Sequence, residues 1–149
     1  MRSILQIGSH GVEVDVAATA ACYARVSQPG PESCGCAHCR NWVAARHLVV
    51  SEELRRLLAS LGIPDNGEIN VAEYTGMRKP HGYIGWYFFV GRVVRGTLGV
   101  VANEFKVGDV SLHLSADHFF FAPEFADQEI CQLNFCTEVD EFLTPADYQ

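Results

Sequence analysis

Three of the six cysteines lie within one short segment, CGCAHC at residues 34–39. The Cys-x-Cys-x-x-Cys spacing can aim three sulfur atoms at one point, because Gly35 permits a tight turn between Cys34 and Cys36. Zinc in proteins takes four ligands, and thiolate is one of the ligands that it prefers. The segment therefore predicts a zinc site formed by Cys34, Cys36 and Cys39, in which the metal has a structural role.

The sequence leaves the fourth ligand of this site open. His47 would lie eight residues after Cys39 on one helix, a rise of about 12 Å, which bonds of about 2 Å cannot bridge. His38 is adjacent to Cys39 and points elsewhere on a helical turn. Cys22 and Cys136 remain as candidate ligands. The alternative is three protein ligands and an open position for water or substrate, as in catalytic zinc sites.

The same segment is compatible with other chemistry. A Cys-x-x-Cys pair at the start of a helix, here Cys36 and Cys39, is typical of redox disulfides, but those motifs follow a buried strand of a βαβ unit that this sequence lacks. An iron–sulfur cluster needs four dedicated cysteines, which are not apparent here. The three residues can also be reduced thiols that hold no metal. Cys131 shares a strand face with Leu133 and Phe135, so we expect it in the core.

The signature Cys-x-Cys-x-x-Cys-Arg resembles the zinc-thiolate motif of glutathione-dependent formaldehyde-activating enzymes. In that family the positions of Cys34, Cys36 and Cys39 hold the catalytic zinc, so the resemblance implies a zinc- or thiol-dependent enzyme that acts on a small electrophile. The family also carries an upstream Cys-x-Cys and a downstream Cys-x-x-Cys for a second, structural zinc. The corresponding parts of this chain hold Cys22, and the separated Cys131 and Cys136.

A second resemblance covers most of the chain. The segment CGCAHCRN at residues 34–41, placed before a helix, and the later stretch GWYFFVG at residues 85–91 are similar to segments of small bacterial proteins of uncharacterised function. This resemblance implies no activity.

Two helices are expected directly after the cysteines. The first covers residues 40–48, with Trp42, Ala45 and Val49 at helical spacing on one side. The second covers residues 51–61, where Ser51 is an N-cap and the leucines recur with the period of a helix. Before the cysteines, the segment QPGPES at residues 28–33 predicts a loop.

The rest of the sequence is rich in β-strand patterns. Residues 12–16 alternate strictly between apolar and acidic types, whereas residues 17–24 suit either a helix or a strand. Further strands are expected at 69–74, 83–90, 93–101, 110–114, 118–121 and 130–135. Because few helical patterns separate these strands, the sheet should be antiparallel. We predict an α+β fold, with an antiparallel sheet or sandwich of about six to seven strands and an inserted helical pair.

Composition limits the classes of function. The chain has 149 residues and predicts a single globular domain over 1–149. Its net charge of −7 disfavours nucleic-acid binding, and no apolar run is long enough to span a membrane. The N-terminus resembles no signal peptide, so we expect a cytoplasmic protein with reduced cysteines.

Three classes of function remain on the sequence alone. The first is a small protein with a structural zinc site. The second is a non-catalytic interaction or immunity-type protein, since an acidic surface suits a protein partner or a second copy of the chain. The third is a zinc or thiol enzyme. Outside the cysteines, Asp117 and His118 could form a general base, but adjacent residues of a strand point to opposite faces, so a turn at the start of a strand is the favoured interpretation. His113 is expected to face solvent and His10 to lie in a turn.

Overall fold

Seven antiparallel strands and four α-helices make up the computed structural model, which describes residues 2–76, 78–98, 104–116 and 122–140. The strands run in the order β1-β2-β4-β7-β6-β5, and β3 pairs with β4 beside this series. This arrangement confirms the predicted α+β fold with an antiparallel sheet. The strands are β1 (Ser3–Ile7), β2 (His10–Val14), β3 (Asn70–Glu73), β4 (His81–Arg95), β5 (Phe105–Val107), β6 (Val110–Ser115) and β7 (Ile130–Val139).

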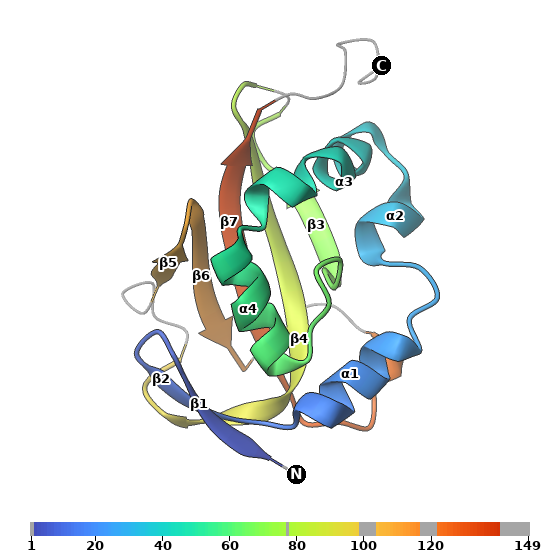
Figure 1. Cartoon of the computed structure of the whole chain (residues 1–149). Helices are drawn as coiled ribbons and strands as arrows, with labels where there is room; N and C mark the ends of the chain where they lie inside the picture. Colours follow the sequence, from blue (N-terminus) through green and yellow to red (C-terminus); the bar gives the residue numbers. More distant parts are fainter. Residues whose placement is uncertain (1, 77, 99–103, 117–121, 141–149) are drawn as a thin grey trace.

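Two of the helices lie across one face of the sheet (Figure 1). They are α3 (Ala37–Val49) and α4 (Glu52–Leu61), which correspond to the predicted helical pair. The Ser51 side chain caps α4 by accepting a hydrogen bond from Leu54 N, and Gly62 ends the helix with a φ of 83°. Two further helices precede this pair, α1 (Val16–Ala24) and the short α2 (Gly30–Cys34).

The helix α2 was not predicted, because its residues suggested a loop. Proline is tolerated in the first turn of a helix, where its missing N–H has no partner to lose, and Pro31 occupies that turn. Ser33 N donates to Pro29 O, and Glu32 on α2 forms an ion pair with Arg46 on α3. This long-range contact has no signature in the local sequence.

The strand β4 is continuous over His81–Arg95, so the prediction of two strands at 83–90 and 93–101 was wrong in this respect. Gly91 does not break the strand. A Cβ atom at Gly91 would lie 2.1 Å from Glu13 O, so glycine here allows the close approach of β2. The first part of β4 pairs with β3 and β7, and its last part pairs with β2.

The helix α1 covers a stretch of the β4 edge that no strand pairs. The Tyr23 hydroxyl donates to Phe88 O and accepts from Phe88 N, and Thr19 Oγ1 accepts from Val90 N. Asp15 N donates to Val90 O. Side chains of α1 thus satisfy backbone groups that an edge strand would otherwise expose.

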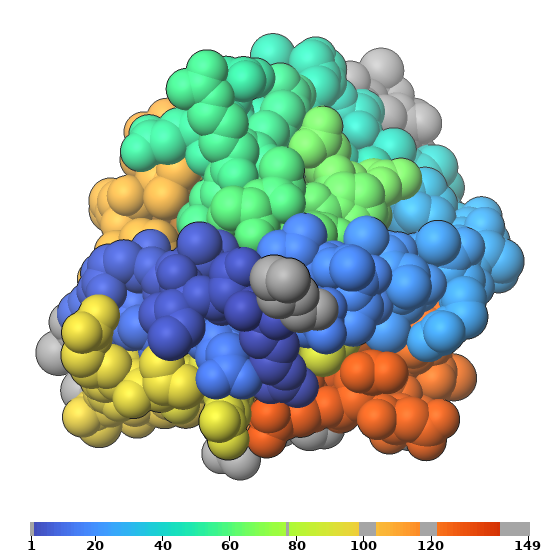
Figure 2. All heavy atoms as spheres, turned by 60° about the horizontal axis from the view of Figure 1, so that its bottom comes forward, coloured from blue at the N-terminus to red at the C-terminus, as the bar shows by residue number. Residues whose placement is uncertain are grey.

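The main core lies between the sheet and the helices α3 and α4. Trp42 of α3 stacks on Phe135 of β7, with ring centroids 5.1 Å apart. Cys131 belongs to this core, as the strand parity predicted. The β1–β2 hairpin, α1 and the last part of β4 lie at the opposite end of the molecule from α3 (Figures 1 and 2).

The strand predictions were incomplete at two places. The strands β1 and β5 were not predicted, and the expected strand at 118–121 lies outside the described residues.

Among the described helices, none combines the length and the apolar character needed to cross a membrane.

Candidate metal centre

The three clustered cysteines lie at the junction of α2 and α3. Cys34 is the last residue of α2, and Gly35 ends that helix with a φ of 68°, which glycine adopts without strain. Cys36 is the N-cap of α3, and its Sγ accepts a hydrogen bond from Cys39 N at 3.4 Å. The chain therefore turns once between the helices and returns the third cysteine to the first two.

The sulfur atoms converge as the spacing predicted. The Sγ atoms of Cys34, Cys36 and Cys39 all lie within 4.8 Å of one another. Zinc–sulfur bonds of about 2.3 Å in a tetrahedral site place two sulfurs about 3.8 Å apart. Small side-chain rotations would therefore bring the three sulfurs to the separation that a bound zinc ion requires.

The site lies at the surface, with one sulfur at its base. Cys34 and Cys36 are exposed, whereas Cys39 is only 5% exposed. A metal ion held by the three sulfurs would therefore have the protein on the side of Cys39 and would remain accessible to solvent on the other side.

The environments of Cys36 and Cys39 affect their thiols in opposite ways. Burial opposes ionisation of Cys36, but hydrogen bonds from the backbone of Cys39 and from the Cys34 thiol outweigh it and lower the Cys36 pKa. Burial raises the pKa of Cys39, and its contacts with the two neighbouring cysteines raise it further. The helix N-terminus thus favours the thiolate form of Cys36, whereas the surroundings of Cys39 favour its protonated form.

A partly buried ion-pair network holds the two helices together. Arg46 on α3 donates from Nε to Glu68 Oε1 at 2.8 Å and from Nη2 to Glu68 Oε2 at 3.0 Å. The same guanidinium donates from Nη1 to Glu32 Oε1 of α2 at 2.7 Å. Trp42 Nε1 adds a hydrogen bond to Glu68 Oε1 at 3.0 Å. We call these four residues the α2–α3 brace.

The first turn of α3 is also fixed to its surroundings. Arg40 Nη1 donates to Gly35 O at 2.9 Å, which closes the turn between the helices. The Tyr83 hydroxyl, on β4, donates to His38 O at 2.8 Å and accepts from Asn41 Nδ2 at 3.3 Å. The backbone that carries the cysteines is therefore positioned by contacts that involve no metal.

The His38 ring does not belong to the group of convergent sulfur atoms, in agreement with the sequence prediction. Its Nδ1 lies 3.6 Å from Glu73 Oε2 on β3, and the Glu73 side chain is buried. The sequence did not predict a role for Glu73, Glu68 or Arg46. Glu68 and Glu73 are distant from the cysteines along the chain, and the fold brings them to α3, on which Arg46 lies.

The remaining candidate ligands do not join the cluster. Cys22 lies in α1, where its Sγ is 3.5 Å from Arg25 Nη2, and Cys136 lies on β7, 3.6 Å from the Tyr74 hydroxyl. His47 lies in the last turn of α3. Within the described part of the chain, the group of convergent ligand atoms consists of the three cysteine sulfurs. Neither Cys22 nor Cys136, which the sequence left open as candidate fourth ligands, belongs to this group.

The other histidines considered in the sequence have different environments. His10 is the first residue of β2 rather than part of a turn; it is buried, and its Nε2 lies 2.7 Å from Thr97 O. His113 is half-buried on β6. Asp117 and His118 lie outside the described residues.

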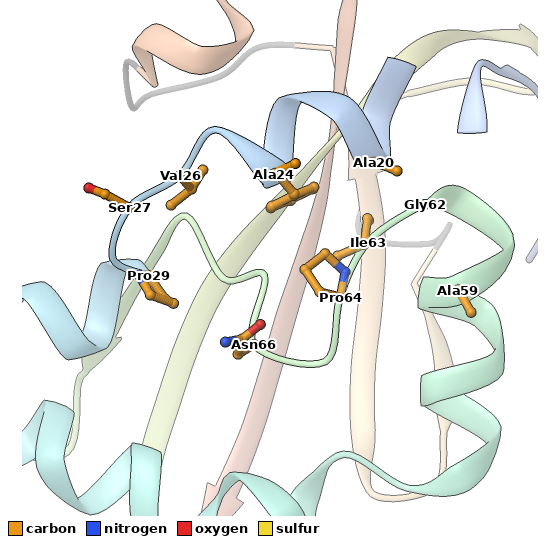
Figure 3. Close-up of a pocket in the computed structure, with 11 residues that line it drawn as sticks. Ala20, Ala24, Val26, Ser27, Pro29, Ala59, Gly62, Ile63, Pro64 and Asn66 are labelled. Atoms are coloured by element: carbon orange, nitrogen blue, oxygen red, sulfur yellow. The ribbon is translucent and has the colours of Figure 1, made fainter. Parts of the chain in front are cut away.

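A separate cavity of about 570 Å³ lies between α1 and the segment that follows α4 (Figure 3). The described residues that line it are mostly small and apolar, and the one ionisable side chain among them is Tyr23, whose hydroxyl is bonded to the Phe88 backbone. The cavity therefore offers a shape without catalytic groups. Its lining comprises Ala20, Tyr23, Ala24, Val26, Ser27, Pro29, Ala59, Gly62, Ile63, Pro64 and Asn66.

Comparison of the chain with protein-family models, curated proteins and solved structures finds no match. The function must therefore be inferred from the geometry of the cysteine cluster itself.

Proposed function

We propose that this protein binds one zinc ion per chain through the thiolates of Cys34, Cys36 and Cys39. The observation that supports this proposal is the convergence of three sulfur atoms within 4.8 Å. Thiolate is a soft ligand that selects zinc or copper(I) over magnesium or calcium. Zinc is the proposed ion because tetrahedral thiolate coordination is its most usual structural site.

The proposed role of the ion is structural and local. A zinc ion bound to all three cysteines would link the end of α2 to the first turn of α3, across the turn at Gly35. The α2–α3 brace already joins the same helices through Arg46. Zinc would then add to an existing connection, so its removal should loosen the junction and leave the sheet in place.

Metal analysis of the untreated full-length protein tests the proposal. We expect about one zinc per chain when the protein is purified without chelator. Replacement by cobalt(II) should give the intense visible and near-ultraviolet absorption of thiolate-bound tetrahedral cobalt. The two measurements report metal content and ligand type separately.

Serine variants identify the ligands. Cys34→Ser and Cys36→Ser alter exposed side chains and should lose most of the zinc without loss of the fold. Cys136→Ser is the matched control, because this half-buried cysteine lies outside the cluster, and it should keep its zinc. Absence of metal together with unchanged stability in chelator would refute the proposal and favour a non-catalytic interaction protein.

A further inference from the structure

The three cysteines of the cluster provide the number of ligands that trivalent arsenic requires. Trivalent arsenic forms three bonds and keeps a lone pair where a fourth ligand would otherwise stand. We propose that Cys34, Cys36 and Cys39 together bind arsenite, taken up as arsenous acid. This inference concerns a second ligand of the same residues and does not depend on zinc being the resident ion.

The number of sulfur atoms carries the proposal. The three Sγ atoms lie within 4.8 Å of one another, and no fourth ligand atom from the described residues belongs to their group. Zinc bound here would need an additional ligand to complete its tetrahedron. Arsenic bound to three thiolates would be complete, with its lone pair on the solvent side.

The exposure of the sulfurs provides a path for entry. Cys34 and Cys36 are exposed and can react first, after which Cys39 at the base can form the third bond. Arsenous acid is uncharged near neutral pH. The net charge of −7, which would repel an anion such as arsenate, therefore does not hinder its approach.

The reaction is a condensation without electron transfer. Each thiol gives one proton to one hydroxyl group of arsenous acid, and that group leaves as water. Three sulfur–arsenic bonds form, three arsenic–oxygen bonds break, and three water molecules are released. Arsenic remains trivalent and sulfur remains at the thiol oxidation level, so no oxidant or reductant is needed.

The protein around the cluster reduces the cost of ordering three thiols. The α2–α3 brace fixes both helices, and the Arg40 contact to Gly35 O closes the turn between them. Preorganisation of this kind improves affinity because little conformational freedom is lost on binding. Cys22, Cys131 and Cys136 belong to no group of three or more convergent ligand atoms among the described residues, so we expect one strong site per chain.

Titration of the reduced, zinc-free, full-length protein with sodium arsenite tests the proposal. Native mass spectrometry should show one arsenic per chain, with the loss of three protons from the protein. X-ray absorption at the arsenic edge should show three sulfur neighbours and no oxygen neighbour. A complex with two sulfurs and one oxygen, or no complex at a small molar excess of arsenite, would overturn the proposal.

Variants distinguish the cluster from the other cysteines. Cys34→Ser and Cys36→Ser should each weaken arsenite binding by at least about tenfold, and Cys136→Ser should leave it unchanged. Unchanged binding by Cys34→Ser would contradict a three-thiolate site, and circular dichroism confirms that each variant is folded. Zinc content is measured on separate, untreated protein, so failure of arsenite binding and failure of the zinc proposal are distinguishable.

Discussion

At the scale of single residues, Cys36 and Cys131 show how the fold sets the reactivity of one type of side chain. Cys36 is exposed at the N-terminus of α3, and hydrogen bonds to its sulfur lower its pKa despite some burial. Cys131 is buried in the main core, and that burial raises its pKa to about 12. Thiolate is the reactive form of cysteine, so Cys36 should react with electrophiles much faster than Cys131.

We expect iodoacetamide to label Cys36 faster than any other cysteine of the folded, metal-free protein. Because the Cys36 pKa is lowered, a larger fraction of its side chain is thiolate at pH 7 than in a free cysteine peptide, and its labelling rate should rise less between pH 7 and 9 than that of the peptide. Cys131 should stay unlabelled until the protein unfolds. Peptide mass spectrometry over a time course measures each rate, and equal labelling of Cys36 and Cys131 in folded protein would contradict this expectation.

At the scale of elements, the α2–α3 brace joins the two helices that carry the cysteines. The Glu68 carboxylate is fully buried, and Arg46 is its charged partner. Loss of one member of a buried ion pair leaves an uncompensated charge, which costs more than the pair itself contributes. Arg46 therefore holds α2 and α3 in place and also neutralises Glu68.

We expect Arg46→Met to lower the free energy of unfolding by about 3–5 kcal/mol. The control is Arg56→Met, which removes an exposed ion pair with Glu52 and should cost less than about 1 kcal/mol. Adding Glu68→Gln to Arg46→Met should recover part of the loss, because the buried charge disappears. Urea denaturation measures all three variants, and equal losses for Arg46→Met and Arg56→Met would contradict a stabilising brace.

The helix α4 and the cysteine cluster could be predicted because their signals are local. Leucines at helical spacing between Ser51 and Gly62 define α4, and the spacing of the three cysteines already implies that their sulfurs meet. The helix α2 and the continuity of β4 could not be predicted in this way. The helix α2 depends on the ion pair between Glu32 and Arg46, and β4 depends on the close approach of β2 to Gly91. Both are contacts between residues that are not neighbours in the sequence.

At the scale of the whole molecule, the sheet and its core are built independently of the cysteine cluster. The core residues of the strands pack against α3 and α4, and the cysteines Cys34 and Cys36 lie outside this core. The proposed metal is therefore attached to a fold that has its own sources of stability. This arrangement differs from zinc fingers, which unfold when the metal is removed.

We expect the chelated protein to keep its helix and strand signals in far-ultraviolet circular dichroism. Its melting temperature should fall by about 5–10 °C relative to protein with free zinc about 100-fold above the dissociation constant, because binding to the folded state adds about 2.7 kcal/mol. Thermal melts with and without EDTA measure the shift. Collapse of the helical signal at room temperature after chelation would show that zinc holds the whole fold together.

The pairing of β4 also fixes an order of events during synthesis. Its residues pair with β2, far earlier in the chain, and with β7, far later, so the sheet cannot close until the end of β7 has left the ribosome. Such distant pairings make folding slow, and translation adds only about 5–20 residues per second. The three cysteines span six residues, and their convergence requires only one turn between two helices. Binding of the proposed ion to a nascent chain therefore need not wait for most of the sheet to be made.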